Sequence, residues 1–249
     1  MTLLALDALT VRRGACPVVD GVSLSVAAGE FVGLIGPNGA GKTTLMRAAL
    51  GLLPHEGRSS LSALPAAQRA RAAAFLPQSR EVAWPVSVET LVALGRVPHG
   101  ARLRDGDRAA VDRALAHMGL QAHRARDALG LSGGELARVL IARVLAQETP
   151  LVLADEPVAG LDPESQIRTM QLFADLARAG RGVVASVHDL GLAARSCTRL
   201  VLMAGGRVVA DGPPMAVLTP ANLREVFGIR AHVAEAEGGP VVVPLAVTR

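Results

Sequence analysis

Apolar and polar positions along this 249-residue chain form two alternating kinds of pattern. Residues 3–11 and 22–26 show strand-like alternation on either side of a turn-prone segment at 13–17, which predicts an antiparallel β layer. Further strands are predicted from short apolar runs at 30–35, 74–77, 151–154, 182–187 and 199–203. Helical spacing lies between these runs at 44–52, 64–74, 163–179 and 189–196. Strands that alternate with helices predict an α/β fold with a mostly parallel sheet.

A helical, polar segment rich in arginine and alanine interrupts this order between about residues 82 and 147. Ser87 opens one helix there with a favourable cap, and further helices are predicted at 107–118 and 134–146. We therefore expect a single domain with an inserted helical lobe. Its parts are a core of about 1–81 and 148–219, the lobe of about 82–147 and a C-terminal tail of about 220–249, in which Val241–Val243 is a candidate edge strand.

Composition argues against several classes of protein. No run of about 18 apolar residues is free of charge, and the N-terminus lacks a basic region with a cleavage site, so neither a membrane span nor a secretion signal is expected. Cys16 and Cys197 lie far apart without metal-ligand spacing, which predicts free, buried thiols in a reducing cytosol. The net charge is only +4, and no basic tract is interleaved with aromatic residues. No nucleic-acid partner is therefore expected.

The apolar run at 30–35 ends in a glycine-rich loop that contains the only lysine of the chain, Lys42. The loop is Gly36-Pro37-Asn38-Gly39-Ala40-Gly41-Lys42-Thr43-Thr44, which fits the phosphate-binding pattern G-x-x-x-x-G-K-[ST]. A lysine ammonium reaches the β- and γ-phosphates from a loop too tight for a planar guanidinium. Chance alone would produce the pattern in about one such chain in a hundred. The strand before the loop and the helix after it favour an anion site.

Two acidic residues, Asp155 and Glu156, follow the apolar run at 151–154. Acids at the carboxyl end of a buried strand face the crevice in which open α/β sheets bind ligands. Asp155 can hold Mg²⁺ together with the Thr43 hydroxyl, and Glu156 can polarise an attacking water. The alternative interpretation is a helix cap or a salt bridge.

A second anion site is predicted at Leu131-Ser132-Gly133-Gly134-Glu135, where a serine and two glycines open a helix. Two sites of this size in one chain are explained if the second closes over a nucleotide held by another copy of the chain. The alternative is a helix cap that happens to contain glycine.

Taken together, these motifs resemble those of ATP-binding cassette (ABC) ATPases, and the resemblance spans almost the whole chain. The phosphate loop is 36–44, the signature is 131–135, and Asp155-Glu156 closes the second acidic motif. Three further segments match the D-loop at 159–162, the switch histidine at His188 and the Q-loop glutamine at Gln78. The resemblance implies a P-loop NTPase core with ATP and Mg²⁺ as its ligands.

The resemblance also implies a role for each matching residue. Glu156 would be the general base, and His188 would contact the γ-phosphate. Lys42 and the loop amides would bind the β- and γ-phosphates. The set expected to arrange Mg²⁺ and water is Thr43, Asp155 and Gln78. The set expected to act at the nucleotide across a head-to-tail dimer is Ser132, Gly133 and Gly134, with Asp162 as a further nucleotide-site residue.

One position departs from the family pattern. The family usually stacks an aromatic residue on adenine, and the corresponding position here is Arg13. A guanidinium plane can stack on a base, and Val18 is expected to pack on the other edge of the ring.

Residues 90–99 and 205–228 resemble the importer branch that serves ferric siderophores, haem and vitamin B12. This implies an ATPase that lies peripherally at the cytoplasmic face of the membrane. Its expected partners are integral permease subunits and, indirectly, a periplasmic or lipoprotein substrate-binding protein. Trp84 and Pro85 would line the groove for the permease, the alternative for Trp84 being packing within the lobe. Alternative functions are another importer's ATPase, a soluble ABC ATPase, a non-hydrolysing nucleotide-binding module, a P-loop kinase and half of an exporter.

Overall fold

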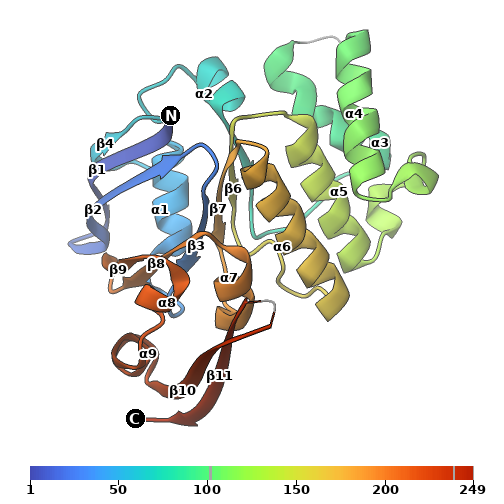
Figure 1. The fold of residues 1–249 in the computed structure, drawn as a ribbon. Helices are drawn as coiled ribbons and strands as arrows, with labels where there is room; N and C mark the ends of the chain where they lie inside the picture. Colours follow the sequence, from blue (N-terminus) through green and yellow to red (C-terminus); the bar gives the residue numbers. More distant parts are fainter. Residues whose placement is uncertain (101–102, 238, 249) are drawn as a thin grey trace.

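The computed structural model describes residues 1–100, 103–237 and 239–248, arranged around a six-stranded sheet (Figure 1). The strand order in this sheet is β5-β6-β7-β3-β8-β9, in which the first five strands are parallel and β9 is antiparallel to β8. The strands are β3 (Phe31–Ile35), β5 (Ala73–Leu76), β6 (Leu151–Ala154), β7 (Gly182–Ser186), β8 (Arg199–Ala204) and β9 (Arg207–Gly212). The predicted α/β class with a mostly parallel sheet is confirmed.

Strand β3 is apolar throughout because it is buried on both faces. Val32 and Leu34 belong to a core shared with α1 (Lys42–Ala49) and the N-terminal β layer. Phe31 and Ile35 belong to the core on the other face, which includes α6 (Pro163–Arg178) and α7 (Leu190–Ser196). Phe31 meets Phe173 of α6 edge to face, with 6.1 Å between the ring centroids.

The predicted antiparallel layer is a three-stranded sheet with the order β2-β1-β4. Its strands are β1 (Thr2–Arg13), β2 (Cys16–Ala27) and β4 (Glu56–Ser59), and β4 was not predicted because its four residues carry no apolar alternation. The expectation for Cys16 was wrong, since this residue lies at the exposed β1–β2 hairpin. Cys197 is buried as expected, and burial raises the pKa of its thiol to about 12.

Three helices form the lobe on the far side of α6: α3 (Val88–Ala93), α4 (Asp105–His117) and α5 (Gly133–Ala146) (Figure 1). The short helix α2 (Ala66–Ala72) precedes β5, and 3₁₀ turns occupy Leu94–His99, Gln121–His123 and Ala128–Gly130. The predicted cap on α3 is present, because Ser87 Oγ accepts from Thr90 N at 3.2 Å. The apolar side chains of this lobe join the core on the α6 face of the main sheet, so lobe and core share one buried cluster.

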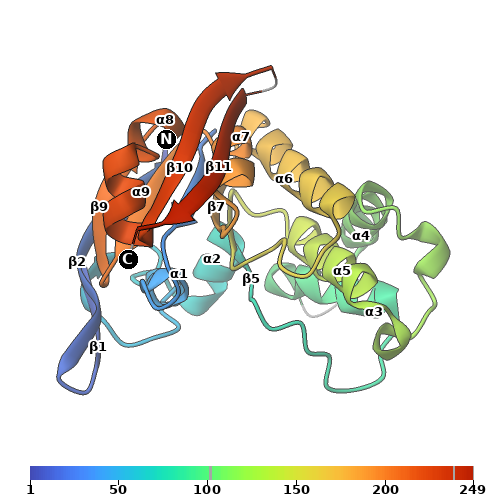
Figure 2. The same cartoon turned by 90° about the horizontal axis from the view of Figure 1, so that it is seen from below.

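The C-terminal segment contains α8 (Pro214–Val217), α9 (Pro220–Phe227) and a hairpin of β10 (Ile229–Ala236) and β11 (Gly239–Val247). Val241–Val243 is therefore a strand, but it pairs with β10 and does not form an edge of the main sheet. Figure 2 shows the hairpin lying along α7, to which it is joined by Arg195 Nε donating to Pro240 O at 3.1 Å. Within the described ranges, every helix is too short or too polar to span a membrane.

Candidate functional site

Four neighbouring strands deliver the predicted nucleotide-site residues to one edge of the sheet. Because β5, β6, β7 and β3 are parallel and adjacent, the segments that follow them meet at their carboxyl ends. They surround a cavity of about 500 Å³. The cavity is lined by Val18, Asn38, Gly39, Ala40, Gly41, Lys42, Thr43, Thr44, Gln78, Glu156 and His188.

The path of the phosphate loop requires glycine at positions 36 and 41. Gly36 has φ +146°, and a Cβ there would lie 2.2 Å from Met203 O. Gly41 has φ +96°, and a Cβ there would lie 2.6 Å from Val18 O. Side chains at these positions would clash with backbone atoms that cannot move aside, so the loop's path depends on both glycines.

Lys42 is buried at the first turn of α1, and its ammonium group holds the loop in shape. Lys42 Nζ donates to Gly36 O at 2.7 Å and to Pro37 O at 3.0 Å. Burial lowers the pKa of Lys42, and the charges of Glu156 and Asp155 act against that shift. The cavity therefore has a positive charge at its floor with two carboxylates nearby.

Asp155 is 1% exposed and lies behind the cavity, where it is joined to the phosphate loop. Asp155 Oδ1 accepts from Thr43 Oγ1 at 3.1 Å and from Ser186 Oγ at 2.8 Å. Its other oxygen, Oδ2, is buried without a hydrogen-bond partner in the described part of the chain. An orphaned carboxylate oxygen beside a threonine hydroxyl fits Mg²⁺, which takes few protein ligands and keeps several waters. The described residues contain no cluster of three or more His, Cys, Asp or Glu that could hold a metal.

Glu156 lies in a strained backbone conformation at the cavity wall. Its φ is +49°, in the left-handed region, which for a residue other than glycine costs on the order of 1–3 kcal/mol. Two contacts hold it there. Glu156 N donates to Ser186 Oγ at 2.7 Å, and its carboxylate oxygen Oε1 lies 2.7 Å from His188 Nε2.

Ser186 is a site residue that no motif in the sequence identifies. It is fully buried at the end of β7, where its hydroxyl accepts from Glu156 N and donates to Asp155 Oδ1. The only signal in the sequence is a hydroxyl among the apolar residues of this strand. Ser186 thereby fixes both acids relative to each other.

The signature segment lies away from the cavity, at the N-terminus of α5. Ser132 and Glu135 form a reciprocal cap: Ser132 Oγ accepts from Glu135 N at 3.3 Å, and Glu135 Oε2 accepts from Ser132 N at 2.8 Å. These backbone and side-chain hydrogen bonds with Ser132 lower the pKa of Glu135 to about 2. The serine uses an acceptor lone pair for the cap, so its O–H remains able to donate to a ligand.

The two signature glycines have no packing role within the described chain. A Cβ on Gly133 would meet no described atom within 4 Å, and one on Gly134 would only touch Leu161 Cδ2 at 4.0 Å. Neither residue has a left-handed backbone conformation. The absence of side chains here therefore suits the close approach of another molecule.

Two other predicted residues also lie outside the cavity. Asp162 caps α6, with Oδ1 accepting from Ser165 N at 2.9 Å. Arg13 is exposed at the end of β1, whereas Val18 lines the cavity. A contact between Arg13 and adenine stays a prediction.

Comparisons with known proteins show similarity to one family over most of the chain. A family model described as ABC transporter matches residues 19–159. The cobalamin import ATP-binding protein BtuD of Halobacterium salinarum is 45% identical over 95% of this chain, although the alignment spans only 62% of that relative's length. The hemin import ATP-binding protein HmuV of Pseudomonas aeruginosa is 42% identical over 97% of this chain and 99% of the relative.

Solved structures are similar over comparable lengths. An inward-facing metal-chelate type ABC transporter gives a TM-score of 0.85 at 25% identity, covering 99% of this chain and 98% of the other. A dimeric bacterial ABC transporter cassette gives a TM-score of 0.76 at 26% identity, covering 85% of this chain and 98% of the other.

Proposed function

Because the chain belongs to the ABC transporter family, we propose that it is the ATP-hydrolysing subunit of an importer for haem, cobalamin or another metal chelate. The proposal of ATP hydrolysis rests on the fact that the phosphate loop, Gln78, Glu156 and His188 line the same cavity. The substrate class is supported by the relatives, which are named as hemin and cobalamin import proteins.

In this proposal the loop amides and Lys42 bind the β- and γ-phosphates of ATP. Glu156 takes a proton from the attacking water, and His188 holds the γ-phosphate in line with that water. Mg²⁺ would be held by Thr43, Asp155 and Gln78 and would neutralise charge on the phosphates. Ser186 keeps both acids in position because it is bonded to each.

The second copy of the chain completes the site. Ser132, Gly133 and Gly134 would donate to the γ-phosphate of a nucleotide bound by the partner, and Asp162 would lie at the same interface. The free Ser132 O–H and the open space around Gly133 support this assignment. Loss of the γ-phosphate on hydrolysis would release the dimer, as in other phosphate-ordered switches.

The membrane partners follow from the importer class. We expect the chain to lie peripherally at the cytoplasmic face of the cell membrane, bound to integral permease subunits. A periplasmic or lipoprotein substrate-binding protein would deliver the chelate to the permease. Trp84 is 61% exposed, which argues against packing within the lobe and favours its use as a docking residue.

The test compares ATP turnover of the wild-type chain with that of Glu156→Gln. Loss of the base should lower kcat by about 10²-fold or more, and ATP should then accumulate in a stable dimer, detected by light scattering. The matched control is Glu164→Gln, which replaces an exposed residue of α6 that pairs with Arg168. Its ATP turnover should equal that of wild type. Normal turnover by Glu156→Gln would refute the assignment of the base.

The importer part needs a separate assay. The chain is reconstituted in liposomes with a permease with which it co-purifies, and uptake of labelled haem and cobalamin is measured with ATP inside. ATP-dependent uptake of either ligand supports the proposal. A permease that stimulates ATP turnover but transports neither ligand nor another metal chelate would refute the substrate class.

A further inference from the structure

A second cavity, of about 180 Å³, lies between the helical lobe and the core. Arg113 and His117 of α4 line it, together with Glu148, which precedes β6, and Arg181, which precedes β7. These positions lie near the amino ends of two parallel strands whose carboxyl ends face the nucleotide cavity. The second cavity is therefore separate from the nucleotide site.

Most charges around this cavity are paired. Glu148 Oε1 accepts from Arg113 Nη2 at 2.8 Å, and Glu148 Oε2 accepts from Arg96 Nη1 at 2.9 Å. Arg96 is buried and is also bonded to Asp107, with 2.8 Å between Nε and Oδ1. Both carboxylates are thus already engaged by arginines.

Arg181 is the exception. Its Nη1 is buried and has no hydrogen-bond partner among the residues that the structure describes. Glu148 is the carboxylate that lines the cavity beside Arg113 and Arg181. Its charge attracts Arg181, but its two oxygens are already bonded to Arg113 and Arg96.

An unpaired, partly buried guanidinium is costly because it loses water without gaining an anion, and arginine cannot escape by deprotonation. Its planar fork matches carboxylate and phosphate oxygens, which makes these anions its strongest partners. The cavity is smaller than the about 300 Å³ at which sites for drug-sized ligands begin, so a nucleotide is excluded. We propose that this cavity binds a small oxyanion, of the phosphate or carboxylate class, between Arg181 and Arg113.

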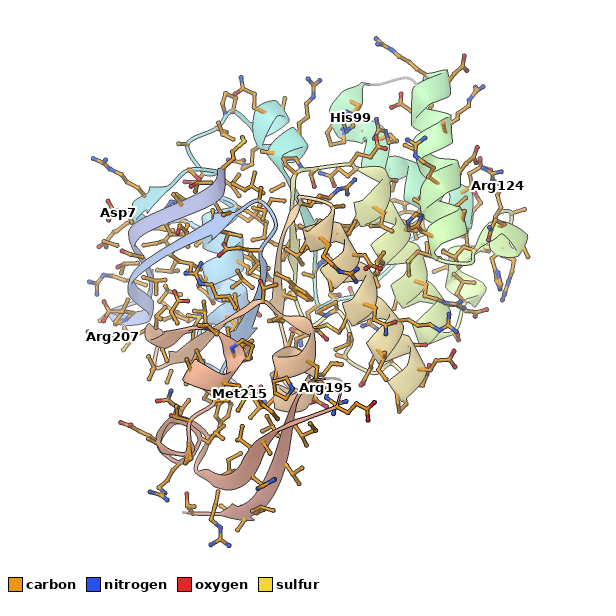
Figure 3. All side chains as sticks on the ribbon, viewed as in Figure 1. Asp7, His99, Arg124, Arg195, Arg207 and Met215 are labelled. Carbon is orange, nitrogen blue, oxygen red and sulfur yellow. The ribbon has the colours of Figure 1, made fainter. Side chains whose placement is uncertain are left out.

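Such an anion would join the lobe to the core. Arg113 belongs to α4, whereas Arg181 lies in the turn between α6 and β7. One hydrogen bond already links lobe and core near this junction, from Gln147 Nε2 to Ala70 O at 2.6 Å. Within the lobe, His99, which Figure 3 labels, lies with its Nε2 2.9 Å from the Gln147 carbonyl oxygen. An oxyanion bound here would add an ionic link between lobe and core and restrain movement of α4 relative to the sheet.

The test measures the unfolding temperature of the full chain as inorganic phosphate replaces chloride at constant ionic strength. Phosphate also fits the phosphate loop, so every protein in the series carries Lys42→Ala, which removes the ammonium group at that site. A ligand that binds only the folded chain raises the unfolding temperature. We expect phosphate to raise the unfolding temperature of Lys42→Ala, and Arg181→Gln to reduce that rise in the Lys42→Ala background.

The matched control is Arg168→Gln, which removes an exposed arginine from α6 and should leave the rise intact. The change in unfolding temperature that Arg181→Gln causes in chloride alone distinguishes anion binding from a structural role of Arg181. In chloride alone, Arg181→Gln should unfold at the same temperature as its parent or higher, because it removes an unpaired charge. A large destabilisation in chloride, or a phosphate-induced rise as large in Arg181→Gln as in its parent, would overturn the proposal.

Further titrations with acetate and malonate distinguish the two anion classes. A larger Arg181-dependent rise with phosphate assigns the site to phosphate, and a larger one with malonate or acetate assigns it to carboxylates. If none of these anions raises the unfolding temperature above that in chloride, the cavity is not an oxyanion site.

Discussion

Glu156 Oε1 and His188 Nε2 are 2.7 Å apart, so the proposed base and the proposed phosphate sensor are hydrogen-bonded to each other. The contact arises because Glu156 follows β6 and His188 follows β7, and these strands are parallel neighbours. The side chain of His188 is 43% exposed, whereas that of Glu156 is 18% exposed. The histidine is thus the freer partner, able to turn toward a bound γ-phosphate while Glu156 stays in place.

Replacing His188 with alanine should slow hydrolysis without preventing ATP binding. The variant loses the group that orients Glu156 and contacts the γ-phosphate, and we expect kcat to fall by about 10²-fold or more. The measurement is steady-state ATP turnover together with nucleotide affinity by fluorescence titration. His232→Ala, an exposed histidine of β10, should leave both unchanged. Wild-type kcat in His188→Ala would remove this residue from the mechanism.

Ser186→Ala should impair both folding and turnover. The substitution removes the fully buried Ser186 hydroxyl that accepts a hydrogen bond from Glu156 N. Leaving this amide without a partner should lower the free energy of unfolding by about 1–3 kcal/mol. Glu156 also loses the bond that holds its left-handed backbone, so kcat should fall. Urea unfolding and ATP turnover measure the two effects. Ser59→Ala removes another buried serine, bonded to Ala49 O, and should lose stability while kcat per folded molecule is unchanged.

Gly133→Ala should change stability and activity in opposite directions. A methyl group at the start of α5 meets no described atom within 4 Å, and alanine favours helix over glycine by up to about 1 kcal/mol. The chain should therefore be as stable as wild type or more so, while ATP-dependent dimerisation and turnover fall because the methyl group enters the interface.

Gly106→Ala is the control for this pair of effects. Gly106 lies in α4, also has open space around its Cβ position and lacks a left-handed conformation. It should gain stability and keep full activity. Equal activity of both glycine variants would contradict the dimer contact at Gly133.

The helix cap formed by Ser132 and Glu135 on α5 should make the stability of the chain depend on pH in the acid range. Hydrogen bonds with Ser132 lower the pKa of Glu135 from 4.5 to about 2. Since the folded value is the lower one, the stabilisation by Glu135 is complete above about pH 4.5 and is lost as the pH falls toward about 2. Thermal unfolding of wild type and Glu135→Gln should thus differ at neutral pH and converge over this window. A difference that is constant with pH would contradict the charged cap.

Trp84→Ala tests the docking surface. The side chain is exposed, so its removal should leave stability and basal ATP turnover unchanged. Binding to the permease, measured by co-purification and by stimulation of turnover, should weaken. Leu129→Ala, which removes another exposed apolar side chain of the lobe, is the control and should bind normally. Unaltered permease binding by Trp84→Ala would return this residue to a role in local packing.

Local patterns in the sequence were sufficient for the fold class, for most strands and helices, and for most of the residues that line the proposed nucleotide cavity. The motif around Lys42 and the acids after β6 have spacings that only a few arrangements use, and the apolar runs that precede them mark buried strands. Short or polar elements, such as β4, carry too few apolar positions for their pattern to be distinctive.

The tertiary structure decided what depends on strand order and on residues distant in the chain. The contact of Glu156 with His188 and the double role of Ser186 each require β6 and β7 to be neighbours. The tertiary structure also decided that the signature segment lies away from its own chain's cavity. Periodicity shows which side of a strand is buried, but not which strand lies beside it. That choice is made by packing of the whole core, because buried polar groups must find partners that the local sequence does not supply.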